Sequence, residues 1–174
     1  MTKREIRASV VSRLSPAKDA IVYDIGAGTG SVSVELAMHA LYGTVYAVER
    51  MKEGCELIAQ NARKFGLDNI DIINASAADV IEKLPAADSV FIGGSGGELE
   101  KIMDIVLKKN PGVHIVITAV TLETLNDSVR LMEDKKVDVI DIVQIAVTQI
   151  KKRGRYHMLA ANNPVFIIEG RGNR

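Results

Sequence analysis

The stretch IVYDIGAGTGSVSVELA, residues 21–37, decides the fold of this protein. It begins with a short β-branched run, passes through a turn with glycines at Gly26, Gly28 and Gly30, and continues as an apolar-rich segment of helical length. Glycine lets a backbone come very close to a ligand, and the first N–H groups of the following helix then point toward that ligand. The stretch therefore predicts a strand, a ligand-binding turn and a helix, in this order.

The same alternation of short apolar runs with longer amphipathic runs continues along the chain. The strand-like runs are AIVYDIG, GTVYAVE, IDIIN, SVFIGG and VHIVITAV, and the helix-like runs are SVSVELAMHAL, KEGCELIAQNARKFG, ELEKIMDIVLKKN and residues 121–136. This alternation is typical of an α/β protein with helices on both faces of a parallel sheet. We expect a Rossmann-like, mostly parallel sheet of seven strands, five crossover helices and one extra helix at the N-terminus.

The last two strands of this sheet differ from the others. Residues 137–150 and 164–170 are strand-like runs separated only by the segment KKRGRYHMLAANN, which has no helical pattern. Two strands joined without a crossover pair antiparallel. The sequence therefore predicts a terminal antiparallel hairpin at one edge of the sheet, with residues 151–163 as its loop.

The composition is that of one ordinary globular domain, residues 1–174. Hydrophobic residues make up 47% of the 174 residues and charged residues 25%, and no linker divides the chain. Basic and acidic residues balance at 22 each and only 4% are aromatic, which disfavours a nucleic-acid partner. No apolar run approaches the roughly 20 residues that cross a bilayer, and the N-terminus MTKREIRASVVSRL lacks the apolar core of a secretory signal. We therefore expect a cytoplasmic protein without a membrane partner.

Thiol and metal chemistry are disfavoured as well. Cys55 is the single cysteine, and its position in a helical pattern indicates a packed thiol rather than a nucleophile. The histidines His39, His114 and His157 do not cluster with acidic residues at metal-ligand spacing. We expect no metal site built by the protein.

An acidic residue precedes the glycine turn, and another ends the next strand. Asp24 stands before the turn, and Glu49 ends the run TVYAVE, where a carboxylate would meet ribose hydroxyls. The dinucleotide fingerprint is G-x-G-x-x-G, whereas here the third glycine comes one residue early and Ser31 occupies its place. An adenosine cofactor fits this pattern and NAD fits it less well. A tight turn without any ligand is the alternative.

This set of features resembles the class I S-adenosylmethionine-dependent methyltransferases, whose sheet also ends in an antiparallel hairpin. The resemblance implies S-adenosylmethionine as the cofactor, with the segment IINASAADV framing the adenine. Ser76 stands where an aspartate would be expected, so the side chain that reads the adenine amine stays open, and Asp79 is interpreted as a helix-end or surface carboxylate. The cofactor-binding residues predicted on this basis are Asp24, Gly26, Gly28, Thr29, Gly30, Glu49, Arg50, Ser76, Ala77 and Gly93.

A second glycine-rich stretch, GGSGG at Gly93–Gly97, follows the fourth strand-like run. In a methyltransferase of this topology that strand end lies beside the transferable methyl. Bare backbone there makes a wide, shallow approach with exposed N–H donors, which suits a bulky substrate with anionic groups. We predict Gly94, Ser95, Gly96 and Glu98 as the catalytic residues. A loop that merely turns the chain into the next helix is the alternative.

The blocks VFIGGSGGELEKI, VITAVTLETL, TKREIRA and NPVFII make the resemblance more specific. The chain resembles the decarboxylating cobalt-precorrin-6B C15-methyltransferases of cobalamin biosynthesis, with matches from Thr2 to Ile168. The resemblance implies methylation of C15 of cobalt-precorrin-6B or precorrin-6B, loss of carbon dioxide from the C12 acetate, and a homotetramer. Its substrate would be a small-molecule tetrapyrrole.

A macrocycle fringed by carboxylates calls for cationic groups around the site. Basic residues gather in two segments, which would supply this rim if both fold over the carboxyl-end edge of the sheet; they are Lys151, Lys152, Arg153 and Arg155 in the hairpin loop, and Lys3, Arg4 and Arg7 near the N-terminus. We predict Arg153, Arg155, Tyr156 and Lys3 as substrate-binding residues. Glu98, Tyr156 and His157 are the candidates for a proton donor after decarboxylation.

Three other functions fit parts of the sequence. They are a class I methyltransferase that acts on another small molecule, on RNA or on protein; a non-catalytic nucleotide-binding module with the same fold; and a nicotinamide oxidoreductase. Cofactor binding, turnover on a tetrapyrrole and the response to NADH separate them.

Overall fold

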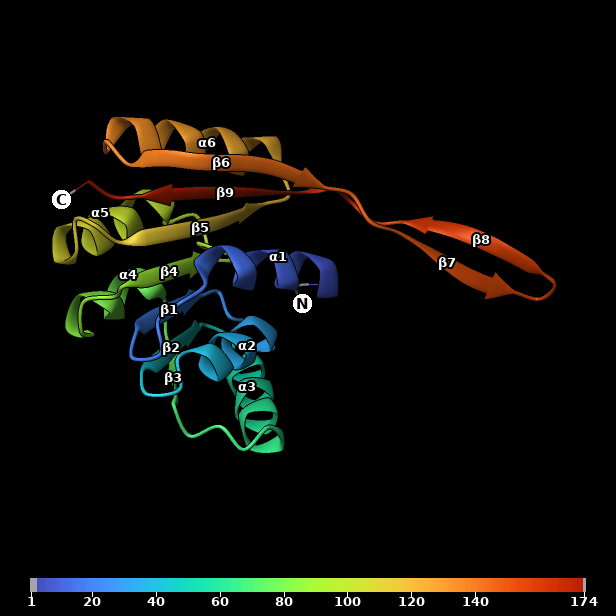
Figure 1. Ribbon diagram of the computed structural model, residues 1–174, viewed down its shortest axis with the longest axis horizontal. Helices are drawn as coiled ribbons and strands as arrows, with labels where there is room; N and C mark the ends of the chain where they lie inside the picture. The colour runs from blue at the N-terminus through green and yellow to red at the C-terminus, as the bar shows by residue number, and fades with distance from the viewer. Residues whose placement is uncertain (1–2, 174) are drawn as a thin grey trace.

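The computed structural model describes residues 3–173, so Thr2, where the resemblance begins, lies outside the described residues. The chain forms a seven-stranded sheet with helices on both faces, and a separate two-stranded ribbon extends from it (Figure 1). The strands of the large sheet are β1 (Ile21–Ile25), β2 (Thr44–Glu49), β3 (Ile70–Asn74), β4 (Ser89–Ile92), β5 (His114–Ala119), β6 (Asp138–Ile145) and β9 (Val165–Arg171). We call this sheet with its helices the body.

The strand order in the body is β3-β2-β1-β4-β5-β9-β6. Strands β1 to β5 pair parallel, and β9 pairs antiparallel with both β5 and β6. The predicted seven-stranded, mostly parallel sheet with a terminal antiparallel hairpin is therefore confirmed. Because the chain moves outward from β1 through β2 to β3 and then returns to place β4 on the other side of β1, the order of the strands reverses between β1 and β4. In open α/β sheets, ligands bind at the carboxyl ends of the strands at such a reversal.

Five crossovers connect the first six strands, and an extra helix precedes them, both as predicted. The helices are α1 (Arg4–Leu14), α2 (Ser31–His39), α3 (Lys52–Lys64), α4 (Ala77–Val80) with the 3-10 turn η1 (Ile81–Lys83), α5 (Leu99–Lys109) and α6 (Leu122–Asp134). Helices α1 and α2 bury their apolar side chains against one face of the sheet, and α5 and α6 bury theirs against the other. Strands β1 and β4 read as continuous apolar runs because both of their faces are covered.

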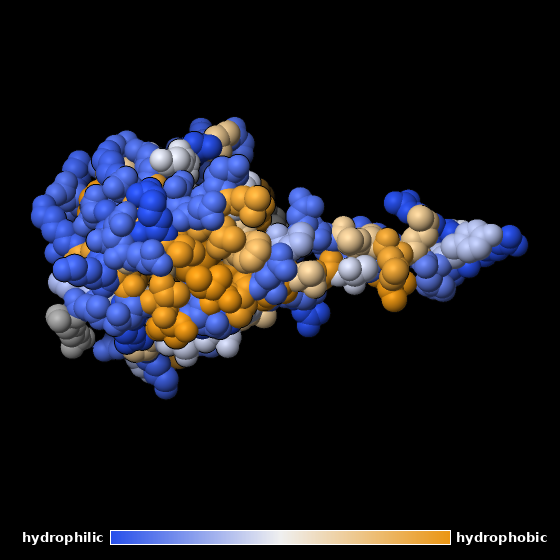
Figure 2. Space-filling view, turned by 90° about the horizontal axis from the view of Figure 1, so that it is seen from above, coloured by the Kyte–Doolittle hydropathy of each residue, from blue (hydrophilic) through white to orange (hydrophobic). Residues whose placement is uncertain are grey.

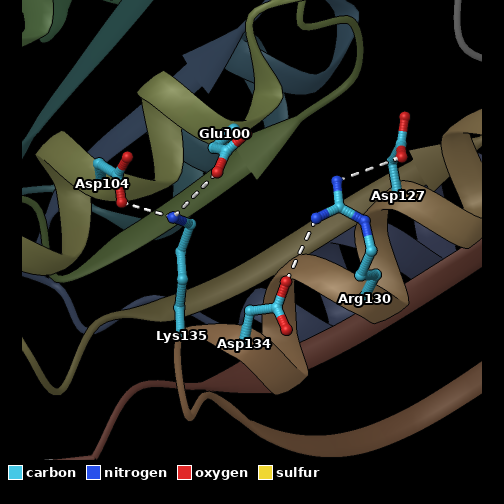
Figure 3. A network of polar contacts seen from close by, with 6 residues as sticks. All are labelled: Glu100, Asp104, Asp127, Arg130, Asp134 and Lys135. Atoms are coloured by element: carbon cyan, nitrogen blue, oxygen red, sulfur yellow. Dashed lines mark hydrogen bonds and ion pairs between the residues drawn. The ribbon is translucent and has the colours of Figure 1, made fainter.

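Ion pairs hold α5 and α6 together on their shared face (Figure 3). Lys135, just after α6, reaches α5, with its Nζ 2.5 Å from Asp104 Oδ1 and 3.9 Å from Glu100 Oε1. Along α6, Arg130 pairs with Asp134 and Asp127 at helical spacing. The Lys135 contacts therefore join the end of α6 to the outer face of α5.

The prediction of a loop at residues 151–163 is wrong. Strands β7 (Thr148–Arg153) and β8 (Tyr156–Ala161) pair antiparallel and form a ribbon. The strand predicted for residues 137–150 is interrupted at residues 146–147, so that it forms β6 and the start of β7. A two-residue turn that contains Gly154, at φ +59°, joins the two strands, and such turns need a left-handed residue. The signal in the sequence was this glycine between two alternating runs.

The ribbon leaves the body at the edge where the parallel strands end. β6 runs in the same direction as β5, because both are antiparallel to β9, and the ribbon follows the last residue of β6. All six residues of β7 are exposed. Among the strands of the described chain, β7 and β8 pair only with each other, and Figure 1 shows the ribbon reaching away from the body. The condition that residues 151–155 fold over the sheet edge of their own chain is therefore not met.

Candidate active site

The two glycine-rich stretches meet at the reversal between β1 and β4. Gly93 N–H and Gly94 N–H donate to Ile25 O, at 2.9 and 3.3 Å, so the stretch Gly93–Gly97, here called the glycine loop, begins beside the end of β1. Gly26 adopts φ +72°, and a Cβ on it would lie 2.5 Å from Gly94 O. Only glycine fits at Gly26, because any side chain there would collide with the backbone of the glycine loop.

The rest of the first glycine turn leads into α2. Gly30 is the residue before α2 and has φ +73°, and a Cβ on it would press against Ile58 at 2.8 Å. Asn61 Nδ2 donates to Thr29 O at 2.8 Å and so ties the turn to α3. The turn is therefore held from both sides in a left-handed backbone that leads directly into the first turn of α2.

Glu49 is held in place by backbone N–H groups. Its Oε2 accepts from Gly28 N–H and its Oε1 accepts from Met51 N–H, both at 2.8 Å, and the residue is 8% exposed. A Cβ on Gly54 in α3 would lie 2.7 Å from Glu49 Cγ, so Gly54 makes room for this side chain. Sequence reasoning missed Gly54, although a glycine early in a helical pattern is a signal for close packing. Each carboxylate oxygen keeps a lone pair for a ligand hydroxyl.

Asp24 is fully buried beneath the turn and does not line the cavity described below. Ser33 Oγ, from α2, donates to its Oδ2 at 2.5 Å, while Oδ1 has no hydrogen-bond partner among the residues that the structure describes. Burial, opposed by the Ser33 bond and reinforced by the Glu49 charge, raises the pKa of Asp24 to about 6. The structure thus places Asp24 as a support between β1 and α2.

A cavity of about 450 Å³ opens at the carboxyl ends of β1, β2 and β4. Its lining contains nine of the predicted site residues, namely Gly26, Glu49, Arg50, Ser76, Ala77, Gly94, Ser95, Gly96 and Glu98, together with Ile25, Val48, Met51 and Ala75. Residues from the segments that follow β1, β2, β3 and β4 therefore meet in one place. Apolar atoms at Val48 and Met51 make flat walls, and the polar groups are few, as in sites for small organic ligands.

Ser76 and Glu98 contact each other across this cavity. Ser76 Oγ, at the start of α4, donates a hydrogen bond to Glu98 Oε2, at the start of α5. Lys101 Nζ is 3.9 Å from Glu98 Oε1 and 3.7 Å from the exposed Asp79. A carboxylate from another loop, that of Glu98, thus lies beside Ser76, and no pattern within IINASAADV indicates this contact.

A second, smaller cavity lies on the other side of the glycine loop. It measures about 270 Å³ and is lined by Gly93–Gly97 together with Ile92, Leu99, Ile117, Thr118, Val120 and Thr124. Gly94 and Gly97 have open space where a Cβ would stand, with no described atom within 4 Å. The glycine loop is therefore a thin wall between the two cavities.

The predicted substrate-binding residues lie elsewhere. Arg153, Arg155 and Tyr156 surround the tip of the ribbon, where Arg155 Nη2 donates to Tyr156 Oη at 2.7 Å. Lys3 is exposed at the start of α1, and Arg7 pairs with Glu35 at 2.5 Å. None of the residues on the ribbon or at the N-terminus lines either of the two cavities at the glycine loop.

Cys55 lies beside Glu49, with its Sγ 3.4 Å from Glu49 O. Burial and the neighbouring Glu49 charge raise the pKa of the Cys55 thiol, which disfavours the nucleophilic thiolate. Within residues 3–173, no three potential ligands among His, Cys, Asp and Glu gather closely enough to hold a metal ion. None of the helices in the described part of the chain combines the length and the apolar character needed to span a bilayer.

Comparison with known proteins identifies relatives along nearly the whole chain. A family model described as the precorrin methyltransferase domain matches residues 1–170. A cobalt-precorrin-6B C(15)-methyltransferase (decarboxylating) from Salmonella typhimurium is 35% identical over 169 residues, 97% of this chain and 87% of the relative.

Two solved structures are similar in both sequence and fold. A precorrin-6y C5,15-methyltransferase from Geobacter metallireducens is 38% identical, with a TM-score of 0.90 over 98% of this chain and 88% of that one. A precorrin 8W decarboxylase from Methanobacterium thermoautotrophicum is 32% identical, with a TM-score of 0.91 over 98% and 91%. The paired glycine stretches, the Glu49 carboxylate and these matches lead to one conclusion: the chain belongs to the precorrin methyltransferase family.

Proposed function

We propose that this protein transfers the methyl group of S-adenosylmethionine to C15 of cobalt-precorrin-6B or precorrin-6B and removes carbon dioxide from the C12 acetate, in cobalamin biosynthesis. The observation that carries the proposal is the contact of Gly26 with Gly94, which gives the cofactor cavity and the glycine loop a common wall. The name of the Salmonella relative, which combines C(15) methylation with decarboxylation, supports the same reaction.

The residues of the larger cavity fit the cofactor. Glu49, already oriented by two N–H groups, would hold the ribose hydroxyls, and the turn at Gly26 and Gly28 would lie against the amino-acid end. Because Gly26 and Gly54 lack side chains, the glycine loop and Glu49 pack closely enough to take their places in the lining of this cavity. When bound, the cofactor supplies an electrophilic methyl group.

The glycine loop would present the substrate to that methyl. Because Gly94 and Gly97 have open space in place of a side chain, a large flat molecule can lie along the loop and meet its N–H groups with anionic substituents. A ring carbon of the precorrin is electron-rich, so the chain's contribution to methyl transfer is alignment of the two reactants rather than a strong base. In the decarboxylation, the conjugated ring accepts the electron pair released from the breaking C–C bond.

We further propose a homotetramer in the cytoplasm, in which the ribbons of neighbouring copies supply Arg153, Arg155 and Tyr156 to the substrate rim. The ribbon exposes Ile150, Met158 and Leu159, and edge strand β6 exposes Val139, Ile140 and Ile142. Figure 2 shows apolar surface on the body next to the base of the ribbon and further apolar atoms along the ribbon. Unpaired strand edges with exposed apolar side chains favour association with another chain.

Calorimetry tests the cofactor half of this proposal. We expect saturable binding of S-adenosylmethionine and S-adenosylhomocysteine, and Glu49→Ala should weaken it by about 1–3 kcal/mol because charge-assisted hydrogen bonds are lost. Glu53→Ala, at an exposed position of α3 outside the cavity, is the matched control and should bind as the wild type does. No binding at millimolar ligand would end the proposal.

A turnover assay tests the proposed substrate and reaction. Incubation with cobalt-precorrin-6B and S-adenosylmethionine should release carbon dioxide in step with methylated product. A protein that binds the cofactor but releases no carbon dioxide would instead be a methyltransferase for another substrate or a non-catalytic binding module.

A further inference from the structure

Given the proposed function, the base of the cofactor has one place to lie in the larger cavity. The first glycine turn occupies one end of this cavity, and Glu49, at the end of β2, would hold the ribose in its middle. Since β2 lies between β1 and β3, the lining on the far side of Glu49 from Gly26 includes residues 75–77 after β3, and Glu98 reaches them through its contact with Ser76. A purine attached to that ribose therefore meets the loops after β3 and β4.

Few polar side chains are available to read the base there. Arg50 carries only donors, and its guanidinium lies against Gly96, where a Cβ would stand 3.3 Å from Nη1. Both oxygens of Glu49 already accept backbone N–H groups near the ribose position. The remaining carboxylate in the lining is that of Glu98.

Glu98 is oriented for this task. Ser76 Oγ–H donates to its Oε2, which turns the carboxylate toward the loop after β3 and leaves lone pairs on both oxygens for a donor from the ligand. The nearest cation is Lys101, whose Nζ lies 3.9 Å away and is more than half exposed, so it binds Glu98 weakly. A serine at position 76 has the donor that holds Glu98, which an aspartate would lack.

We propose that Glu98 is the residue that selects adenine, by accepting a hydrogen bond from its 6-amino group. In this chain the selecting carboxylate has moved from the loop after β3 to the start of α5, and Ser76 is its positioning residue. A base with an oxygen at position 6 would place an acceptor against the carboxylate, and a site built around a donor rejects such an analogue.

Binding of two ligands that differ at the Watson–Crick edge of the base, 6-amino and unprotonated N1 against 6-oxo and N1–H, tests this role without turnover. S-adenosylhomocysteine and S-inosylhomocysteine are titrated calorimetrically into the wild type and into Glu98→Gln. The wild type should prefer the adenosyl ligand by about 10- to 100-fold, the range for a hydrogen bond to a charged group. In Glu98→Gln the amide can donate to the 6-oxo group, so the preference should fall below about threefold or reverse.

Two further variants complete the test. Ser76→Ala keeps Glu98 but removes the hydroxyl that positions it. This variant should narrow the preference for the adenosyl ligand over the inosyl ligand several-fold. Asp79→Asn, an exposed carboxylate on the same rim, is the matched control and should leave the preference unchanged. Thermal unfolding of each variant confirms that it is folded.

The outcomes separate the two proposals. If the wild type binds both ligands equally, or if Glu98→Gln keeps the full preference for adenine, Glu98 does not select the base, while the methyltransferase function stands. If the wild type binds neither ligand, the proposed function fails and this inference fails with it.

Discussion

The residues proposed to bind the cofactor lie at the carboxyl edge of the body, and most of those proposed to bind the substrate lie on the ribbon. The two regions differ in burial. At the edge, Glu49 and Asp24 are buried and the backbone of both glycine stretches is held by hydrogen bonds. On the ribbon, every residue of β7 is exposed and the strands pair only with each other within the described chain. The difference teaches that one folded chain contains the whole cavity proposed for the cofactor, whereas the body of the same chain leaves the basic residues of the ribbon uncovered.

The largest effect should come from Gly26→Ala in the body. The new Cβ would lie 2.5 Å from Gly94 O, and the residue would keep φ +72°, so we expect a loss of about 4 kcal/mol in the free energy of unfolding. Urea denaturation of both proteins measures this loss.

Gly94→Ala is the matched control on the other side of the same contact. A Cβ there has no described atom within 4 Å, so stability should change by less than about 1 kcal/mol, while the methyl group would intrude on the cavity and weaken cofactor binding. Equal destabilisation by both substitutions would contradict the view that the two stretches are packed at Gly26.

The next effect depends on pH and concerns the buried Asp24. Its pKa is raised to about 6 from 3.8, so its contribution to stability is present in full below about pH 4 and is lost as the pH rises through 6. Relative to the wild type, Asp24→Asn should therefore gain stability over this window, reaching about 3 kcal/mol above pH 7.

Chemical denaturation of both proteins at several values between pH 4 and 8 measures that difference. Asp79→Asn serves as the exposed control and should show no such trend. A difference that stays constant with pH would mean that the Asp24 carboxyl titrates alike in the folded and unfolded chains.

The smallest effect on the body should come from removing the ribbon. Val147 O already accepts from Asn162 N–H at 2.9 Å, so residues 148–161 can be replaced by Asn-Gly, which favours a tight hairpin turn. We expect the free energy of unfolding to change by less than about 1 kcal/mol and cofactor binding to persist, because exposed residues contribute little to the core.

Light scattering and turnover then show what the ribbon does. Loss of both self-association and product formation, with cofactor binding intact, is the expected result. A shortened protein that still turns over cobalt-precorrin-6B would show that the ribbon residues are not part of the substrate rim.

Much of the site could be predicted because local patterns in the sequence mark its positions. Once the strand order is known, the strand ends fix where the glycine turn and the carboxylate lie, namely Gly26, Gly28, Gly30 and Glu49. Gly54 and Ser33 escaped notice because their roles depend on side chains from other elements, Glu49 and Asp24 respectively. The sequence around Gly54 or Ser33 does not indicate which distant side chain each one contacts.

The sequence by itself determined the succession of strands and helices in the body and the positions of both glycine stretches, because hydrophobic periodicity and backbone freedom are local properties. Its resemblance to known proteins indicated the family. Only the tertiary structure decided that Gly26 touches Gly94, that Ser76 holds Glu98, and that residues 148–161 form a ribbon instead of a loop over the site. These depend on which distant segments come together, and that is set by burial of the whole chain rather than by any one stretch.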